Sequence, residues 1–364
     1  MWHNAFPILA ALIAGLVQLH RTRKTINFRG GAKYPASPIH STDANLLTDS
    51  EKEEYHRDGF ILKKGLLQGD ALADMISAGE ELYASQHALD AVFNKSFKKL
   101  SFELWRKDDR FAQLAFESHL PSLSAELLDI TPSEDSSENT AIPSAEQSVR
   151  ILRDGFFGFR STNNTGCGFH VDDKYFWPAS DESTGVNFWV ALSPMRITEG
   201  GGIRVVNQSL AEPFFEECLK VISKPVFPPI TCEMETHSPD CHKQMLEASM
   251  VFDMEPGDAL IWDRWTFHRT EPFVTEGEEH RLRYTIRYVP GTAEASGYHH
   301  DSQKPGEVFN SPHYPQVWPL AVKSEIDAIQ RGLDKDQDLA PLSTLKKMSR
   351  KALTKLRSTD QARW

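Results

Sequence analysis

Two histidines and one aspartate have the residue types and the spacing of an iron site. His170 and Asp172 are separated by one residue, and His268 lies 98 positions after His170 (268 minus 170). Residues i and i+2 of an extended segment point to the same face, so His170 and Asp172 can bind one metal while Val171 packs behind them. This ligand set holds Fe(II) on one face and leaves three adjacent coordination positions open. His268 must then reach the metal from another strand.

Each half of this pattern also has a plainer interpretation. A His-x-Asp tripeptide often arises by chance, and a lone histidine after an aromatic residue is more often a hydrogen-bonded interior side chain. The sequence RLRYTIRY at 281–288 strengthens the metal interpretation, because cationic and apolar side chains alternate there as on a half-buried strand. Such a strand places Arg281 and Arg283 on the face opposite Leu282 and Tyr284. A buried guanidinium needs an anion and suits a carboxylate, although a solvent-facing edge strand fits the same alternation.

An ordered set of motifs around these residues resembles a known family. In chain order they are LTDSE at 47–51, DGFI at 58–61, HVD at 170–172, VNFWVAL at 186–192, EGGGIRVVNQS at 199–209 and PGDALIW at 256–262. The distal His268 follows the last of them. As an ordered set these motifs resemble the phytanoyl-CoA dioxygenase family, over roughly residues 48 to 292.

The resemblance implies an enzyme that requires Fe(II), 2-oxoglutarate and O2, with His170, Asp172 and His268 as iron ligands. Relatives that halogenate carry a small residue in place of the carboxylate. The retained Asp172 therefore favours hydroxylation or another oxidation at C–H of a small organic substrate, with release of succinate and CO2. Two alternatives stay open, namely a non-catalytic jelly-roll protein that binds metal or acts as a sensor, and a zinc hydrolase with the same ligands. The side chains expected to face the substrate are Asn163, Asn164, Lys174, Tyr175, Trp177 and Arg204.

The resemblance also implies where 2-oxoglutarate binds. It assigns Arg281 to the distal carboxylate of 2-oxoglutarate, the Thr270 hydroxyl to assist Arg281, and Trp189 to a place beside the co-substrate. Arg281 lies 13 positions after the distal histidine (281 minus 268), further than is usual in the family, so Arg283 is an alternative. Relatives commonly have Gly-Ser-His where this chain has NQS at 207–209. This difference removes one histidine from the expected rim of the site and weakens any inference of the substrate from the family.

The patterning of the chain predicts a mainly β fold with flanking helices. Alternating segments separated by turns rich in Gly and Pro fit a double-stranded β-helix, the jelly roll of cupin-like proteins, with the metal in the mouth of the barrel. Helices are expected at 48–57, with acidic residues in the first turn, and at 70–91, with Asp70 as the N-cap. The expected strands are 149–160, 186–193, 202–206, 258–262 and 281–289.

The composition fits one catalytic domain with appendages. The chain has 364 residues, of which 40% are hydrophobic and 10% aromatic, so it can bury a large core. A formal net charge of -11 argues against a nucleic-acid binder, and the oligomeric state is left open. The expected parts are a hydrophobic anchor or targeting segment at 1–24, a linker at 25–47, the dioxygenase domain at 48–320 with a mobile insertion near 129–148, and a basic helical tail at 321–364.

The four cysteines show no paired C-x-x-C spacing. This favours a reducing compartment over a disulfide-stapled fold, although four cysteines can pair. Cys232, His237, Cys241 and His242 lie close together in the sequence and suggest a zinc knot, but structural zinc sites space their ligands in defined pairs. An irregular insertion beside the barrel is the expected structure. The four cysteines are Cys167, Cys218, Cys232 and Cys241.

The apolar segment at 5–19 predicts membrane association. Its fifteen residues span roughly 22 Å as a helix, short of the ~30 Å hydrocarbon core, so a thin anchor, a cleaved signal peptide and an organellar presequence all stay open. The basic residues that follow it predict an anchor whose catalytic domain stays cytoplasmic. The lack of acidic residues before Asp43 is typical of an organellar import signal. An anchor would favour a lipophilic substrate.

Overall fold

The computed structural model describes residues 47–85, 99–131, 144–160, 168–172, 176–222, 234–274, 280–297, 303–311 and 313–319. They all belong to one compact unit, Ile26–Leu320. The segment 1–24, nearly all of the linker 25–47, residues 132–143 of the insertion and the tail 321–364 lie outside the described residues, so the statements made for them stay predictions. Among the described helices, none is long and apolar enough to cross a membrane.

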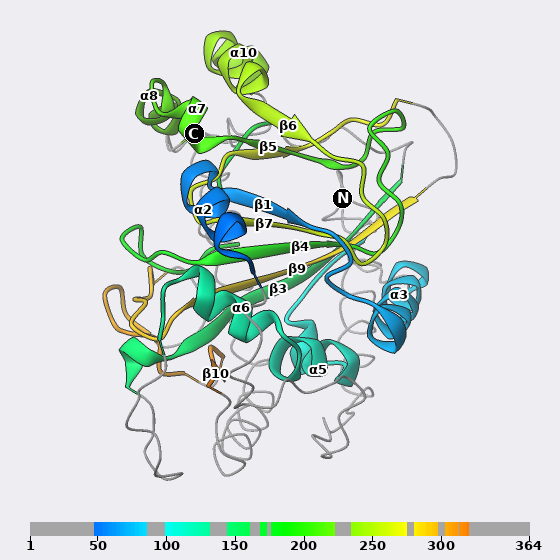
Figure 1. Cartoon of the computed structure of the whole chain (residues 1–364), viewed down its shortest axis with the longest axis vertical. Coiled ribbons are helices and arrows are strands. Elements are labelled where there is room, and N and C mark those ends of the chain that lie inside the picture. Colours follow the sequence, from blue (N-terminus) through cyan, green and yellow to red (C-terminus); the bar gives the residue numbers. More distant parts are fainter. Residues whose placement is uncertain are drawn as a thin grey trace, which may run out of the picture. The chain divides into compact units, whose positions relative to one another are not determined.

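Seven strands form the larger of two antiparallel sheets (Figure 1). They run in the order β1-β7-β4-β9-β3-β10, and β2 pairs with β3 as well. The central strand β9 pairs with β3 on one side and with β4 on the other. The bounds are β1 (Phe60–Lys63), β2 (Lys99–Phe102), β3 (Val149–Arg160), β4 (Val186–Ala191), β7 (Ala259–Asp263), β9 (His280–Pro290) and β10 (Gln316–Trp318).

The smaller sheet carries both halves of the predicted metal pattern. Its strands are β5 (Ile203–Val206), β6 (Ser249–Val251) and β8 (His268–Thr270), in the order β6-β5-β8. His170 and His268 exchange two backbone hydrogen bonds, with N···O distances of 3.0 and 2.9 Å. The His-x-Asp segment therefore lies beside β8 and extends this sheet, which brings together residues that are far apart in the sequence.

Apolar side chains fill the space between the two sheets. Trp189, Leu260 and Trp262 of the larger sheet pack in one buried cluster with Ile203 and Val205 of the smaller sheet. None of the five side chains is more than 5% exposed. Burial of this area from both sheets joins them into a curled half-barrel, which confirms the predicted jelly roll.

Helices cover the other face of the larger sheet, as Figure 1 shows for α3 (Gly69–Ala84), α5 (Asp109–Glu117) and α6 (Leu120–Leu127). The rings of Tyr284 on β9 and Phe111 on α5 lie 5.1 Å apart. The Tyr288 hydroxyl donates to the carbonyl of Ala115 at 3.0 Å. Because alternate residues of a strand point to opposite faces, Arg283 of β9 points toward the smaller sheet, as the sequence predicted.

The first described helix, α2 (Asp49–Asp58), confirms the helix expected at 48–57. Thr48 and Glu51 form a reciprocal capping box at its start. Gly59 ends it with a positive φ of 78°, a conformation that glycine adopts without steric cost. The N-cap expected for the next helix is wrong, because α3 begins one residue before Asp70 and its N-cap is Gln68, without a side-chain hydrogen bond.

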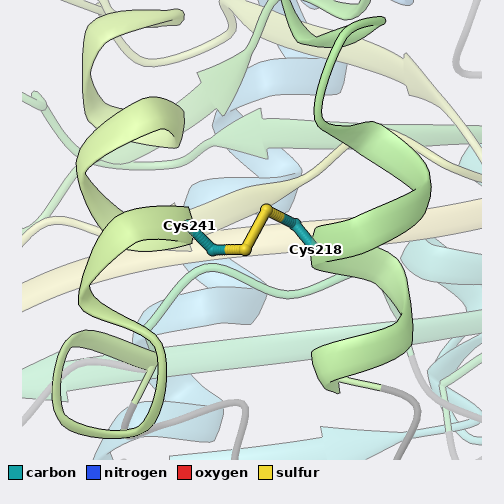
Figure 2. The surroundings of a disulfide bond; sticks show 2 residues. All are labelled: Cys218 and Cys241. Carbon is teal, nitrogen blue, oxygen red and sulfur yellow. A yellow bond between two sulfur atoms is a disulfide. The ribbon is translucent and has the colours of Figure 1, made fainter.

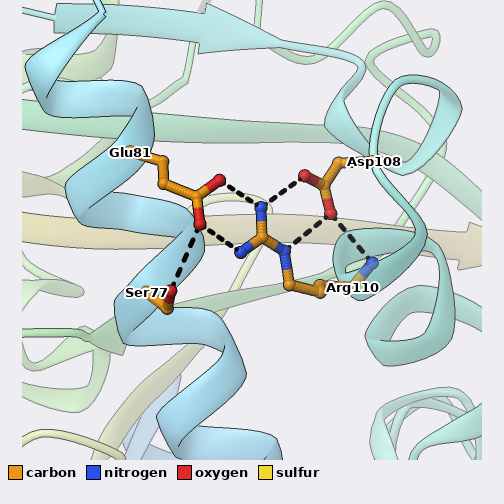
Figure 3. A network of polar contacts seen from close by, with 4 residues as sticks. All are labelled: Ser77, Glu81, Asp108 and Arg110. Atoms are coloured by element: carbon orange, nitrogen blue, oxygen red, sulfur yellow. Dashed lines mark hydrogen bonds and ion pairs between the residues drawn. The ribbon is translucent and has the colours of Figure 1, made fainter. Parts of the chain in front are cut away.

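An ion-pair network joins two of the buttressing helices (Figure 3). Both terminal nitrogens of Arg110, on α5, donate to the Glu81 carboxylate of α3 at 2.8 Å. The same guanidinium also donates to Asp108 at 2.7 and 3.0 Å. Ser77 completes the network by donating to Glu81 at 3.2 Å. The bidentate geometry fixes how α3 and α5 meet beneath the sheet.

A disulfide joins two helices beside the smaller sheet (Figure 2). Cys218 lies on α8 (Phe215–Ile222) and Cys241 on α10 (Pro239–Glu247), 23 positions further along the chain. Both side chains are buried. The preference for unpaired cysteines, drawn from the missing C-x-x-C spacing, is therefore wrong for this pair, because two cysteines far apart in the sequence meet where the helices pack. The other described helices are α7 (Gln208–Ala211) and α9 (Met234–His237).

The disulfide also removes the zinc alternative for the cysteine- and histidine-rich segment. Cys241 is bonded to Cys218 and has no thiolate to offer a metal. Cys232 and Cys167 lie outside the described residues. Among the residues that the structure describes, the group with metal-binding geometry is the predicted one of two histidines and an aspartate.

Candidate functional site

His170, Asp172 and His268 converge on one point. One ligand atom from each lies within 4.8 Å of the others. The imidazole rings of the two histidines are 4.4 Å apart between centroids, and Nε2 of His268 is 3.7 Å from Oδ1 of Asp172. Asp172 and His268 are buried, while His170 is half-buried. The set has the donor chemistry and spacing that a non-haem Fe(II) ion requires.

Hydrogen bonds to the backbone turn both histidines toward this point. Nδ1 of His170 lies 2.8 Å from the carbonyl oxygen of Gly168, and Nδ1 of His268 lies 3.0 Å from that of Thr266. A carbonyl oxygen only accepts, so Nδ1 donates in each case and Nε2 keeps its lone pair. The hydrogen bond at Nδ1 fixes the tautomer and the ring orientation that a histidine needs in order to bind a metal through Nε2.

Two arginines hold the carboxylate ligand. Nε of Arg287 donates to Oδ2 of Asp172 at 2.7 Å, and Nη1 of Arg264 donates to the backbone carbonyl of Asp172 at 2.8 Å. Burial acts to raise the pKa of Asp172, but the charge of Arg287, together with its hydrogen bond, outweighs burial and lowers that pKa to about 2. Asp172 is therefore ionised at neutral pH, and Oδ1 is directed toward His268.

His268 is held in its neutral form. Burial, followed by the neighbouring His170, lowers the pKa of His268 to about 3. The ring of Trp262 lies against it, with centroids 4.9 Å apart. A neutral imidazole with a free Nε2 is the form that binds a metal, so this environment favours coordination.

A buried apolar cluster packs behind the ligand segments. Phe169 and Val171 flank His170, and Phe267 precedes His268; all three belong to the cluster that contains Cys218 and Cys241. The disulfide-bonded helices therefore support the strands from the side away from the metal. Such packing restricts the movement of the ligands.

The NQS sequence, where relatives commonly have Gly-Ser-His, positions the segment before His268. The side chain of Asn207 caps α7. Nε2 of Gln208 donates to Oδ1 of Asp263 at 2.7 Å and to Oγ1 of Thr266 at 3.0 Å. Because the carbonyl of Thr266 accepts from His268, Gln208 helps to fix the orientation of that imidazole.

Arg283 meets Thr270 inside the half-barrel. Nη2 of Arg283 donates to Oγ1 of Thr270 at 3.0 Å. The guanidinium lies over the ring of Phe159 at 3.8 Å and over that of Trp189 at 5.1 Å. Thr270 is two residues after His268 on β8, so both point to the same face, about 6.7 Å apart along the strand. Thr270 and Trp189, both expected from the sequence to lie near the co-substrate, thus both contact Arg283.

Arg281, the residue assigned to 2-oxoglutarate from the sequence, lies elsewhere. Its Nη2 donates to the Glu199 carboxylate at 2.6 Å, and its guanidinium lies 5.6 Å from the Phe273 ring. Glu199 is 43% exposed, so this pair reaches the protein surface. Arg281 and Arg283 share a face of β9, as predicted, but the structure brings the second of them to Thr270.

The other residues expected to face a substrate fall into two groups. Trp177 is buried in a separate apolar cluster with Leu152 and Val289. Arg204 pairs with Glu271 at 2.9 Å on β5. The remaining candidates, Asn163, Asn164, Lys174 and Tyr175, lie outside the described residues.

Sequence reasoning missed Arg287 and Arg264, which hold Asp172. Arg287 was within the alternating run and shares a strand face with Arg283, so the same alternation could have indicated it. Arg264 comes directly after the predicted strand at 258–262, and no local pattern distinguishes it from a surface residue. Its contact with Asp172 depends on how the two segments pack.

The two curled sheets with a His-Asp-His group between them define the class of the protein, a jelly roll with a non-haem metal site. The solved structures of similar fold include the non-haem carbocyclase SnoK of nogalamycin biosynthesis, at 14% identity over 75% of this chain and 97% of that one (TM-score 0.54). The epimerase SnoN of the same biosynthesis matches at 15% identity over 74% and 97% (TM-score 0.52). EctD from S. alaskensis with bound Fe matches at 16% over 74% and 85% (TM-score 0.50).

The family model described as phytanoyl-CoA dioxygenase matches residues 55–281. This is more than half of the chain, so the protein belongs to the phytanoyl-CoA dioxygenase family. It is thus an oxygenase of the non-haem iron, 2-oxoglutarate-dependent class, as the sequence motifs predicted. No curated protein sequence matches the chain.

Proposed function

We propose that the protein oxidises a C–H bond of a small organic molecule, with Fe(II) held by His170, Asp172 and His268. The observation that carries the proposal is the convergence of three ligand atoms within 4.8 Å. When bound, iron and 2-oxoglutarate together supply the oxidising power, with release of succinate and CO2. Hydroxylation is the outcome that the retained carboxylate favours. Proteins of similar fold include a carbocyclase and an epimerase, so the fold alone does not decide the reaction and the product must be identified by experiment.

The protein supplies orientation and a dry site for this chemistry. The two histidines offer Nε2 because Nδ1 of each is bonded to the backbone. Arg287 keeps the Asp172 carboxylate ionised and oriented, and Arg264 holds the backbone of the same residue. Loss of such a partner of a metal ligand typically lowers the metal affinity about 10- to 100-fold.

Arg283, in place of Arg281, is our candidate for the distal carboxylate of 2-oxoglutarate. Two contacts of Arg283 support it, the hydrogen bond with Thr270 and the neighbouring Trp189 ring, and Thr270 itself lies two residues after the metal ligand His268 on β8. A five-carbon dicarboxylate can bridge the roughly 6.7 Å between the two positions. Arg281 already donates to Glu199 at the surface.

Three phenylalanine rings, one of which lies beside the arginine that bonds Asp172, form the candidate substrate surface. Phe102, Phe157 and Phe176 pack together, with ring centroids 5.6 to 6.2 Å apart. The guanidinium of Arg287, which bonds Asp172, lies 5.5 Å from the Phe176 ring. Phe102 and Phe176 are half-buried, so an apolar substrate could cover them within reach of the metal.

Membrane association through residues 5–19 remains part of the proposal, although that segment lies outside the described residues. Its support is the apolar sequence and the basic residues that follow it. Carbonate extraction of membranes from cells that express the full chain, or a chain beginning at residue 25, tests the point. Loss of the pelleted protein only in the shortened chain is the expected result.

Succinate formation in the absence of substrate tests the proposed function. The metal-free full chain would be loaded with Fe(II) under argon, mixed with 2-oxoglutarate and exposed to oxygen. We expect slow succinate release, no release from His268→Ala, and unchanged release from His237→Ala, a control at an exposed histidine on α9. A zinc hydrolase or a non-catalytic scaffold would release no succinate, and that result would contradict the proposal.

A further inference from the structure

Asn187 is a buried side-chain amide that is neither a metal ligand nor a hydrogen-bond partner of one. It lies on β4 in an otherwise apolar strand and is 0% exposed. Within the part of the chain that the structure describes, neither Oδ1 nor Nδ2 of Asn187 has a hydrogen-bond partner. Burial of such a group without a partner is destabilising, and buried polar side chains in native proteins are nearly always paired. A ligand is one reason for a chain to keep it.

The pairing of the strands shows which way Asn187 points. In the sheet it stands opposite Trp262 of β7 on one side and Arg287 of β9 on the other. Directly paired residues of neighbouring strands have side chains on the same face of a sheet. Trp262 lies against the His268 ring, and Arg287 bonds the Asp172 carboxylate. The Asn187 side chain therefore lies on the face of the sheet whose neighbouring residues, Trp262 and Arg287, contact the iron ligands.

The polar neighbours of Asn187 are already engaged. Arg287 donates through Nε to Asp172 and through Nη1 to the Thr285 hydroxyl at 3.3 Å. A primary amide carries two N–H donors and one acceptor oxygen, so it is suited to the oxygens of a carboxylate. Two residues further along the same face, Trp189 of β4 is paired with Thr285 of β9. Arg283 comes two residues beyond Thr285, again on this face of β9. Asn187 and Arg283 thus lie on the same face of the sheet, with Trp189 and Thr285 between them.

We infer that Asn187 donates a hydrogen bond to the metal-chelating 2-oxo-acid end of 2-oxoglutarate, while Arg283 holds the opposite carboxylate. This inference rests on the proposed function. It makes Asn187 a positioning residue for the co-substrate, with no role as a metal ligand. It also explains why an unpaired amide persists in the core: the cost is present in the free protein and is offset when the co-substrate binds.

The test compares Asn187→Leu, which keeps a similar shape without polar atoms, with the wild-type full chain. Three quantities are measured: the Tm of the metal-free protein, the Kd of Fe(II) alone, and the Kd of 2-oxoglutarate for the anaerobic Fe(II) protein from its visible absorption. We expect an equal or higher Tm, an unchanged Fe(II) Kd and a 2-oxoglutarate Kd raised about 10- to 100-fold, the loss typical of a hydrogen bond to a charged group. Asn187→Ala removes the same atoms and serves if Asn187→Leu does not fold.

Either of two results with Asn187→Leu would overturn the inference. An unchanged Kd of 2-oxoglutarate would show that Asn187 does not touch the co-substrate. Equal losses in Fe(II) and 2-oxoglutarate affinity would instead make Asn187 a support for Asp172 through Arg287. In a double-mutant cycle with Arg283→Leu, the two effects on the Kd of 2-oxoglutarate should multiply, because the residues act on opposite ends. Wild-type protein that binds Fe(II) but not 2-oxoglutarate would contradict the proposed function itself, and the inference with it.

Discussion

Arg287 donates through Nε to Oδ2 of Asp172 at 2.7 Å, and both side chains are almost completely buried. The bond leaves the other carboxylate oxygen directed at His268. A buried arginine on the central strand therefore decides which oxygen of Asp172 is offered to the metal. The Arg287–Asp172 pair connects the larger sheet to the segment that extends the smaller one.

Removal of Arg287 should weaken iron binding. In Arg287→Leu we expect the Kd of Fe(II) to rise about 10- to 100-fold, because Asp172 loses the charge and hydrogen bond that keep it ionised and oriented. Arg204→Leu, which breaks the ion pair with Glu271 and leaves the hydrogen bonds of the metal ligands in place, is the matched control and should leave this Kd unchanged. Anaerobic titration with Fe(II) measures both. Equal Fe(II) affinity in Arg287→Leu and the wild type would show that the pair is only structural.

The two arginines of β9 should differ in their effect on the co-substrate. Arg283→Leu should raise the Kd of 2-oxoglutarate at least about 30-fold, as expected when one partner of a buried charged pair is removed. Arg281→Leu should change it by less than about threefold, because its partner Glu199 lies at the surface. Calorimetric titration of the anaerobic Fe(II) protein gives both values. The reverse ranking would restore the assignment made from the sequence.

The Cys218–Cys241 bond should stabilise the helices behind the metal ligands. Closing a loop of this length contributes about 3 kcal/mol in the chain-entropy account. Cys218→Ala, Cys241→Ala and the double variant should all lose the same free energy of unfolding, since any of them removes one bond. Urea denaturation of the wild type with and without reductant is the control. Losses that add in the double variant would show that the two thiols are not bonded in the protein.

Where the disulfide forms bears on the compartment of the protein. Disulfides persist in oxidising compartments, whereas the basic residues after segment 5–19 favour a cytoplasmic domain. Alkylation of intact cells before lysis, followed by mass mapping, distinguishes the two. Recovery of Cys218 and Cys241 as a bonded pair favours an oxidising compartment, and their recovery as alkylated thiols favours the cytoplasm.

Asp154 should give the stability of the protein a distinctive dependence on pH. Burial raises the pKa of Asp154 to about 6 from a reference of 3.8, although two backbone N–H groups and the Tyr284 hydroxyl donate to it. Between these pH values the folded state binds more protons than the unfolded state. The contribution of Asp154 to the free energy of unfolding therefore falls as pH rises from about 4 to 6, by roughly 3 kcal/mol.

The comparison with Asp154→Asn isolates this contribution. The free energy of unfolding of the wild type, relative to that of the variant, should be larger at pH 4 than at pH 7. The reason is that the carboxyl group at position 154, which the variant lacks, loses its proton in that range. Urea unfolding of both proteins at several pH values measures the difference. A difference that does not change with pH would show that Asp154 ionises at its ordinary pKa.

The long strands were predictable from the sequence because each contains enough alternation to indicate its face. The strands expected at 149–160 and 281–289 correspond to β3 and β9 within one residue at each end. By contrast, β6 and β8 have three residues each, too few for any periodicity. They become strands because β5 lies between them and satisfies their backbone groups.

The site was predictable to a similar degree. The metal ligands could be predicted because His170 and Asp172 lie two residues apart, a spacing that places both side chains on one face of a strand. The same strand geometry indicated that Arg281 and Arg283 share a face. Periodicity fixes the face of a strand but not the depth of a residue in the barrel, so it could not choose between the two. The partners of Asp172 and the disulfide depend on contacts between segments far apart in the chain, which no local pattern reports.

Anaerobic titration of the Fe(II)-loaded full chain with 2-oxoglutarate tests whether His170, Asp172 and His268 hold iron that binds the co-substrate. We expect a weak visible charge-transfer band that saturates at one equivalent of 2-oxoglutarate, is absent in His170→Ala and in His268→Ala, and remains in His237→Ala. Folded wild-type protein that binds Fe(II) and 2-oxoglutarate without the band, or a band that survives in both ligand variants, would contradict this expectation.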